Sequence, residues 1–206
     1  MIKNKKFLEG KFLPMSDKNI ILRDKDIREP FHNWLREKHP DLLDTKIFHE
    51  FPIPRPSARV DIAVVNGQLS GFEIKSDADT LGRLPRQVAS FNCVFDRMAI
   101  VTTRRHLDSV LRIVPEWWGV CVARDDGTFK ERRKGRVNRK QNIKSVLYLL
   151  SKEELLFAVD CCGNVNCRKS DRRDQIVSAI ADSIPYKEIL DTVRLSLKRR
   201  ESSSVS

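Results

Sequence analysis

Residues 59–75 read RVDIAVVNGQLSGFEIK, and this stretch decides the fold of the chain. A β-branched run from Arg59 to Val65 is followed by a second apolar run over residues 68–75. The Asn66-Gly67 pair between the two runs is a strong signal for a tight turn between antiparallel strands. The stretch therefore predicts a β-hairpin, and the neighbouring segments can be placed around it.

The two predicted strands carry two acids and one lysine. Asp61 lies on the first strand, and Glu73 and Lys75 lie on the second. Because side chains alternate along a strand, Glu73 and Lys75 share one face. Two carboxylates on neighbouring strands suit a divalent metal ion, and a lysine beside them can orient water or stabilise charge on a phosphate group. We therefore expect this face to support metal-dependent hydrolysis of phosphodiester bonds.

The geometry of the turn decides whether the two acids can share a metal ion. A strict two-residue turn at Asn66-Gly67 would direct Asp61 and Glu73 to opposite faces of the sheet. A three-residue turn over residues 65–67, or a bulge at Gly71, would place both acids on one face. The metal-site hypothesis therefore requires an odd-numbered loop or a bulge in this hairpin.

Strand and helix patterns alternate on both sides of the hairpin. Helices are predicted at residues 28–38, from Leu81 to Phe91, and at 106–113; strands are predicted at 45–51, 98–102 and 118–123. Three more helical patterns follow at about 142–161, 171–183 and 186–200. This order predicts an α/β fold: a mixed central sheet of four or five strands flanked by helices, with a basic C-terminal helical lobe.

The chain is strongly basic, with 39 Lys and Arg against 28 Asp and Glu and a formal net charge of +11. Such an excess favours a polyanionic partner, because cations release counterions from a phosphate backbone. We expect the partner to be nucleic acid, and DNA in preference to RNA. A basic surface that only keeps the protein in solution is the alternative. The residues expected to contact phosphate are Arg83, Arg86, Arg132, Arg133, Lys134 and Arg136.

The cysteines and the apolar runs bear on the cellular setting. The five cysteines are an odd number with no Cys-x-x-Cys pair, which fits a reducing cytoplasm better than a disulfide framework. No apolar run is long enough for a signal peptide or a membrane span. We therefore expect a cytoplasmic protein with no membrane partner, and a homodimer stays an open option.

Asp61, Glu73-Ile74-Lys75 and the helix after them resemble the PD-(D/E)XK nuclease superfamily. Residues 59–101, together with 115–119, look like a bacterial and phage family of small restriction-endonuclease-like proteins within it. The resemblance runs from about residue 24 to residue 200. It implies a restriction-endonuclease-like fold, with Asp61, Glu73 and the Ile74 carbonyl as ligands of Mg²⁺ (or Mn²⁺) and Lys75 as a catalytic residue.

Three further positions bear on this resemblance. Val60 stands where the family name has a proline, a common departure. In one branch of the superfamily a Gln on the next helix is followed four residues later by a Tyr; Gln87 matches, whereas Phe91 replaces the Tyr. Gln87 is therefore expected to help hold substrate or water. Glu50 can add a third metal-binding carboxylate, and an exposed strand-end acid is the alternative.

These observations predict four parts and one main function. The parts are a flexible basic extension at residues 1–22, a nuclease-like core at 23–130, a basic helical region at 131–200 and a disordered tail at 201–206. The main function is metal-dependent hydrolysis of nucleic acid. Two alternatives stay open: a non-catalytic DNA-binding protein on a nuclease-like fold, or a structural ion-pair cluster formed by Asp61, Glu73 and Lys75.

Overall fold

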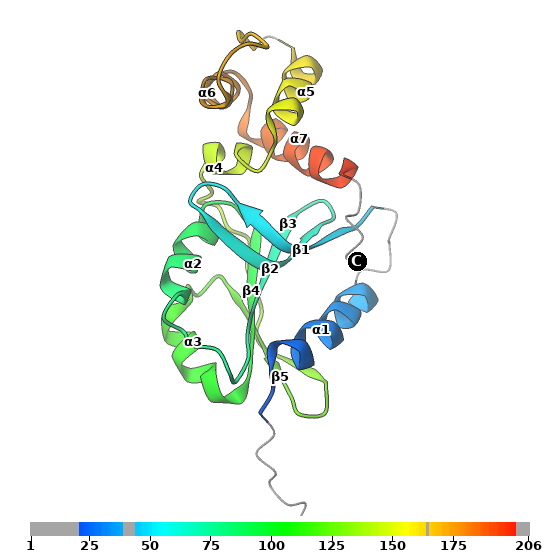
Figure 1. The fold of residues 1–206 in the computed structure, drawn as a ribbon, viewed down its shortest axis with the longest axis vertical. Helices are drawn as coiled ribbons and strands as arrows, with labels where there is room; N and C mark the ends of the chain where they lie inside the picture. The colour runs from blue at the N-terminus through cyan, green and yellow to red at the C-terminus, as the bar shows by residue number, and fades with distance from the viewer. Residues whose placement is uncertain (1–20, 39–43, 164, 201–206) are drawn as a thin grey trace, which may run out of the picture.

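A six-stranded mixed sheet forms the centre of the computed structural model, which describes residues 21–38, 44–163 and 165–200 (Figure 1). The strands lie in sequence order: β1 (Lys46–Ile53), β2 (Ala58–Val65), β3 (Leu69–Lys75), β4 (Arg97–Thr102), β5 (Gly119–Ala123) and β6 (Phe129–Arg133). β3, β4 and β5 run parallel, whereas the other neighbouring pairs are antiparallel. The predicted tail and residues 1–20 of the predicted extension lie outside the described residues.

Helices cover both faces of the sheet and one of its ends (Figure 1). They are α1 (Asp24–Lys38), α2 (Leu84–Asn92), the short 3-10 helix η1 (Arg104–His106), α3 (Leu107–Ile113), α4 (Ile143–Leu147), α5 (Lys152–Cys162), α6 (Arg173–Ser183) and α7 (Tyr186–Arg199). α1 packs on one face through Ile27, Phe31 and Leu35, α2 and α3 lie on the other, and α4 to α7 form the lobe. The predicted α/β fold with a mixed sheet and flanking helices is confirmed. Within the described residues, no helix has both the length and the apolar character needed to cross a bilayer.

Three details differ from the expected elements. No strand was predicted at residues 129–133, because Lys and Arg dominate this stretch; β6 lies there and makes the sheet six-stranded. The helical pattern at 142–161 is two helices, since Ser151 caps α5 by accepting a hydrogen bond from the Glu154 N–H. α1 begins at Asp24, so Pro30 lies inside the helix rather than in its first turn.

The hairpin between β2 and β3 has the odd-numbered loop that the two acids require. Val65 lies opposite Leu69, so the connection is the three residues 66–68, and Gly67 has a φ of 93°. This φ is one that glycine adopts without strain. The loop lies one residue later than expected, but its parity is the predicted one and places Asp61 and Glu73 on the same face.

The hydrophobic core is continuous between the sheet and the helical lobe. One cluster joins Ala63 and Val65 of β2 to apolar side chains of α4, α6 and α7. A buried ion pair adds to this contact: Arg194 of α7 donates to both carboxylate oxygens of Asp96 at 3.0 Å. Asp96 also accepts the Leu69 N–H, so the lobe is fixed to the start of β3.

Residues 130–144, which we call the basic segment, lie fixed against the body of the protein. The N–H groups of Arg136, Asn138 and Asn142 each donate, at 2.8 Å, to carbonyls of residues 117, 96 and 93. The buried Asn138 amide donates to the Asn92 and Phe95 carbonyls at 2.8 and 3.0 Å. The segment is therefore held at several points along its length.

Asn138→Ala should lower the free energy of unfolding by roughly 1–3 kcal/mol, because the buried Phe95 carbonyl and the partly buried Asn92 carbonyl would lose their donor. Chemical denaturation followed by circular dichroism measures this loss. Asn166→Ala, at an exposed loop position, is the control and should change stability little. Equal effects of the two substitutions would contradict the role given to Asn138.

Candidate functional site

The carboxylate of Asp61 is engaged on both oxygens. Oδ2 accepts a hydrogen bond from the backbone N–H of Ile74 on β3 at 2.7 Å. The carboxylate thus takes the role that a main-chain carbonyl of a neighbouring strand usually has. Oδ1 accepts from Arg28 Nη2 at 2.7 Å. Burial raises the pKa of Asp61, and the Ile74 hydrogen bond and the charge of Arg28 oppose this rise. Asp61 therefore holds β3 to β2 and α1 to the sheet.

Arg28 of α1 gathers three acids around its guanidinium. Besides Asp61, it pairs with Asp24 at 2.8 Å and with Glu50 at 2.8 Å. Glu50 also pairs with Arg59 at 2.7 Å, and its backbone has a positive φ of 50°. Burial opposes the charge of Arg28, yet hydrogen bonds and charges of Asp24 and Asp61 raise its pKa. A cation of the chain itself thus occupies the space between these carboxylates.

Glu73 and Lys75 form a buried ion pair beside α2. Their side chains are 2% and 5% exposed, and Lys75 Nζ donates to Glu73 Oε1 at 2.7 Å. Gln87 Nε2, from α2, donates to the same oxygen at 2.5 Å. Glu73 Oε2 and Gln87 Oε1 are buried without a hydrogen-bond partner. Burial first, and then repulsion by Asp61, raises the pKa of Glu73 to about 7 despite Lys75 and Gln87.

The donor set does not fit the predicted Mg²⁺ or Mn²⁺. Of the oxygens of Asp61, Glu73 and Glu50, only Glu73 Oε2 is without a partner. Ile74, whose carbonyl was the fourth expected ligand, lies opposite Val101 in the parallel pair of β3 and β4. Mg²⁺ needs near-octahedral oxygen ligands, usually including one or two free carboxylates. Among the described residues, no three Asp, Glu, His or Cys side chains form a group that could hold a metal ion.

The expected phosphate contacts fall in two places. Arg83 and Arg86 are exposed at the start of α2. Arg132, Arg133, Lys134 and Arg136 lie on the basic segment. Arg133 differs from the other three, because its guanidinium donates to the Trp118 and Pro115 carbonyls at 2.8 and 2.9 Å. Its side chain therefore also fixes the end of β6.

An open hollow of about 660 Å³ lies along the basic segment. Its lining is Arg97, Lys134, Gly135, Arg136, Val137 and Arg139. Arg97 is oriented by Gln68 Oε1 at 2.7 Å and by the Gly135 carbonyl at 3.0 Å. The lining thus carries four cations and no acid.

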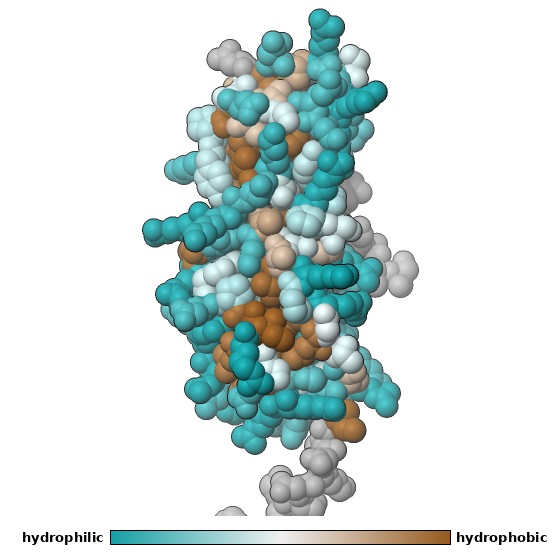
Figure 2. All heavy atoms as spheres, turned by 90° about the vertical axis from the view of Figure 1, so that its left-hand side faces the viewer, coloured by the Kyte–Doolittle hydropathy of each residue, from teal (hydrophilic) through white to brown (hydrophobic). Residues whose placement is uncertain are grey.

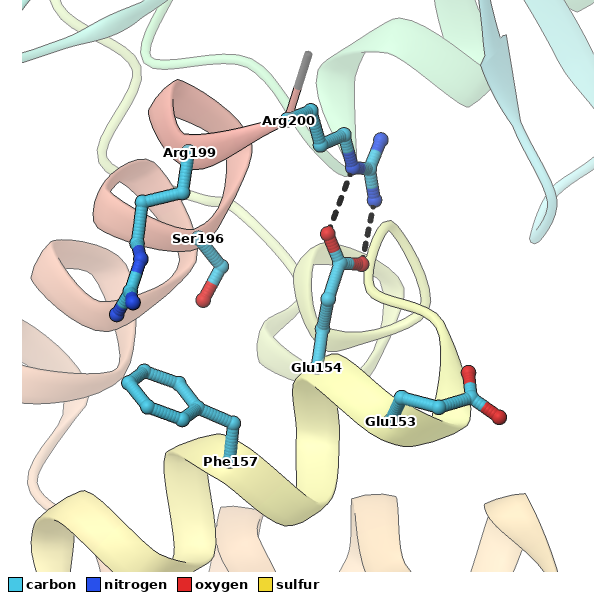
Figure 3. A pocket seen from close by; sticks show the side chains of 6 residues that line it. All are labelled: Glu153, Glu154, Phe157, Ser196, Arg199 and Arg200. Carbon is cyan, nitrogen blue, oxygen red and sulfur yellow. Dashed lines mark hydrogen bonds and ion pairs between the residues drawn. The ribbon is translucent and has the colours of Figure 1, made fainter.

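A second hollow, of about 300 Å³, lies between α5 and α7 (Figure 3). Here Arg200 pairs with Glu154 at 2.7 Å, and Arg199 lies over the Phe157 ring at 4.6 Å. With Glu153 on its rim, this hollow has two acids against two cations. It therefore lacks the single sign of charge that distinguishes the hollow beside the basic segment.

Comparison with known proteins identifies the family. A family model described as Bacteriophage P4 protein cII matches residues 18–206. Protein cII of Enterobacteria phage P4 is 31% identical over 183 residues, which cover 87% of this chain and 68% of that protein. The chain therefore belongs to the bacteriophage P4 protein cII family. A protein of unknown function from Silicibacter pomeroyi has a TM-score of 0.44 and 14% identity, over 74% of this chain and 100% of that one.

This membership overturns the resemblance to the PD-(D/E)XK superfamily and the nuclease function drawn from it. The interpretation as a metal-binding restriction-endonuclease-like protein is wrong for the same reason, and the absence of a metal-holding group among the described residues agrees with that. The motif that suggested a nuclease is short: an acid on one strand of a hairpin and Glu-x-Lys on the next. The same side chains can instead make structural ion pairs.

Arg28, the residue that joins the acids, was not among the predicted site residues. Its signal was present, since Asp24 and Arg28 are four residues apart and such pairs meet on a helix surface. That spacing does not reveal that the same guanidinium reaches β1 and β2.

At pH 8, where Glu73 is ionised, Lys75→Met should lower the free energy of unfolding by roughly 3 kcal/mol, because the Glu73 carboxylate would stay buried without its cation. The double substitution Glu73→Gln with Lys75→Met should recover most of the loss, since both charges leave the interior together. Thermal and chemical denaturation measure both values, with the exposed Lys169→Met as control. If the double variant were as unstable as Lys75→Met, the structural pairing of Glu73 and Lys75 would be contradicted.

Glu73 should make stability depend on pH. The folded chain holds this proton up to about pH 7, above the ordinary value of 4.5, so the stabilisation is complete below 4.5 and is lost as pH rises through 7. The free energy of unfolding should fall by up to about 3 kcal/mol from about pH 5 to pH 8, relative to Glu73→Gln. Parallel pH profiles of the two proteins would refute the assignment of this proton to Glu73.

Proposed function

We propose that this protein is a non-catalytic DNA-binding protein, and that the basic segment makes its main contacts with phosphate. The main support for this proposal is the hollow beside that segment, whose lining has four cations and no acid. A concave surface of one sign attracts a polyanion and gains affinity through counterion release.

The distribution of charge supports this choice of surface. Residues 130–144 hold eight Lys and Arg side chains and one acid, Glu131. The backbone hydrogen bonds of Arg136, Asn138 and Asn142 fix the segment, so it loses little conformational entropy when it binds. Figure 2 shows the face that carries α2 and α3, where apolar atoms gather between hydrophilic ones.

The acidic cluster supports the non-catalytic part of the proposal. Asp61 bonds Ile74 and Arg28, and Glu73 pairs with Lys75. Each of these contacts stabilises the fold, and none leaves a pair of free carboxylates facing solvent. DNA binding therefore stands independently of the residues that suggested catalysis.

The test is a titration of fluorescently labelled DNA at several salt concentrations. The triple substitution Arg132→Ala, Lys134→Ala and Arg136→Ala should make the slope of log affinity against log salt shallower by roughly 2–3, about 0.9 for each lost phosphate contact. Arg133 is left in place because it supports β6.

The control carries the same change of charge elsewhere: Lys25→Ala, Arg168→Ala and Lys169→Ala, all at exposed positions. It should leave most of the slope intact. Wild-type protein should also leave plasmid DNA uncut with Mg²⁺ or Mn²⁺. No binding at low salt, or equal slopes for the two triple variants, would refute the proposed surface; metal-dependent cutting would refute the non-catalytic role.

A further inference from the structure

The lining of the basic hollow has a chemical character that separates two forms of nucleic acid. It consists of the cations Arg97, Lys134, Arg136 and Arg139, with Gly135 and Val137 between them. It contains no aromatic side chain. Proteins that bind single strands combine cations with aromatic rings on which the exposed bases stack, at about 1–3 kcal/mol per base. The hollow offers contacts to phosphates but no aromatic ring on which bases could stack.

The wall of the hollow is rigid. Gly135 lies against Gly119 of β5, and a Cβ at Gly135 would meet the Gly119 nitrogen at 3.1 Å. On either side of Val137, the Arg136 and Asn138 N–H groups donate to carbonyls of the body of the protein. A fixed wall suits a stiff ligand of constant shape, whereas a flexible single strand would lose conformational entropy on adopting that shape.

The cations of the hollow also match a high charge density. A duplex carries one phosphate charge per about 1.7 Å of its axis, which is twice the density of either strand along the same axis. Arg97 is held by Gln68 and by the Gly135 carbonyl, so its guanidinium is oriented before a ligand arrives. Such pre-oriented donors favour a backbone whose phosphates have regular positions.

We propose that the hollow beside the basic segment binds the sugar-phosphate backbone of double-stranded nucleic acid in preference to a single strand. This inference rests on the proposed DNA-binding function and adds the form of the ligand. The shared chemistry is a regular double-stranded phosphate backbone, which duplex DNA and duplex RNA both present. The exposed Tyr186, whose hydroxyl donates to Gln141 Oε1 at 2.7 Å, is not part of the lining.

The experiment compares labelled oligonucleotides of one length and sequence with the full chain at one salt concentration: duplex DNA, each DNA strand alone, and duplex RNA. Duplex DNA should bind at least about tenfold more tightly than either strand, because the salt slope per contact is steeper for duplexes. Binding of duplex RNA at a similar affinity would assign the ligand as the double-stranded backbone in general; much weaker binding would restrict it to DNA. Both results support the inference.

Arg136→Ala with Arg139→Ala tests the location. This pair should reduce duplex affinity about tenfold and make the salt slope shallower by roughly 2, more than the charge-matched control Arg168→Ala with Lys169→Ala. Single-strand affinity equal to or above duplex affinity would overturn this inference and leave DNA binding in place. A loss of duplex affinity equal to that of the control variant would overturn the hollow as the binding site. No binding to any oligonucleotide would overturn the proposed function as well.

Discussion

The three-residue connection between β2 and β3 sets which side chains of the central strands face α2 and which face α1. A shift of one residue would exchange the two faces of β3 relative to β2. Because Val65 lies opposite Leu69, Ala63 and Val65 belong to the apolar cluster shared with α2 and the lobe. Ile62 and Val64 belong to the second cluster, which packs against α1. The same register places Asp61 beside Glu73. The separation of the two cores and the grouping of the acids therefore have one common cause.

The acids show how ionisable side chains can serve a fold. Asp61 replaces a missing strand partner for Ile74 and at the same time holds Arg28 of α1. Glu73 and Lys75 neutralise each other under α2. Buried pairs of this kind add little net stability compared with apolar side chains, but losing one partner is costly. Their arrangement ties α1 and α2 to the same pair of strands from opposite sides of the sheet.

Local patterns predicted five of the six strands and were insufficient for the site. The alternation and turn signal of residues 59–75 predicted β2 and β3, because these depend on neighbours in sequence. The odd-numbered loop between them was instead a requirement of the metal-site hypothesis. β6 was missed, since its exposed cations hide a strand whose stability comes from pairing with β5. The engagement of Asp61 by Arg28 depends on where α1 docks, which a pattern of residues around Asp61 and Glu73 does not contain. Spacing alone could not distinguish a metal site from an ion-pair network.

β6 has a consequence for the behaviour of the protein in concentrated solution. It is an edge strand of the sheet, and an exposed edge has free backbone groups that can pair with the edge of another molecule. Lys130 and Arg132 are exposed along this edge, and two copies brought together there would place like charges side by side. The cations that we propose contact phosphate would therefore also oppose the growth of intermolecular sheets. A nucleic acid that neutralised them would remove that protection while covering the edge itself.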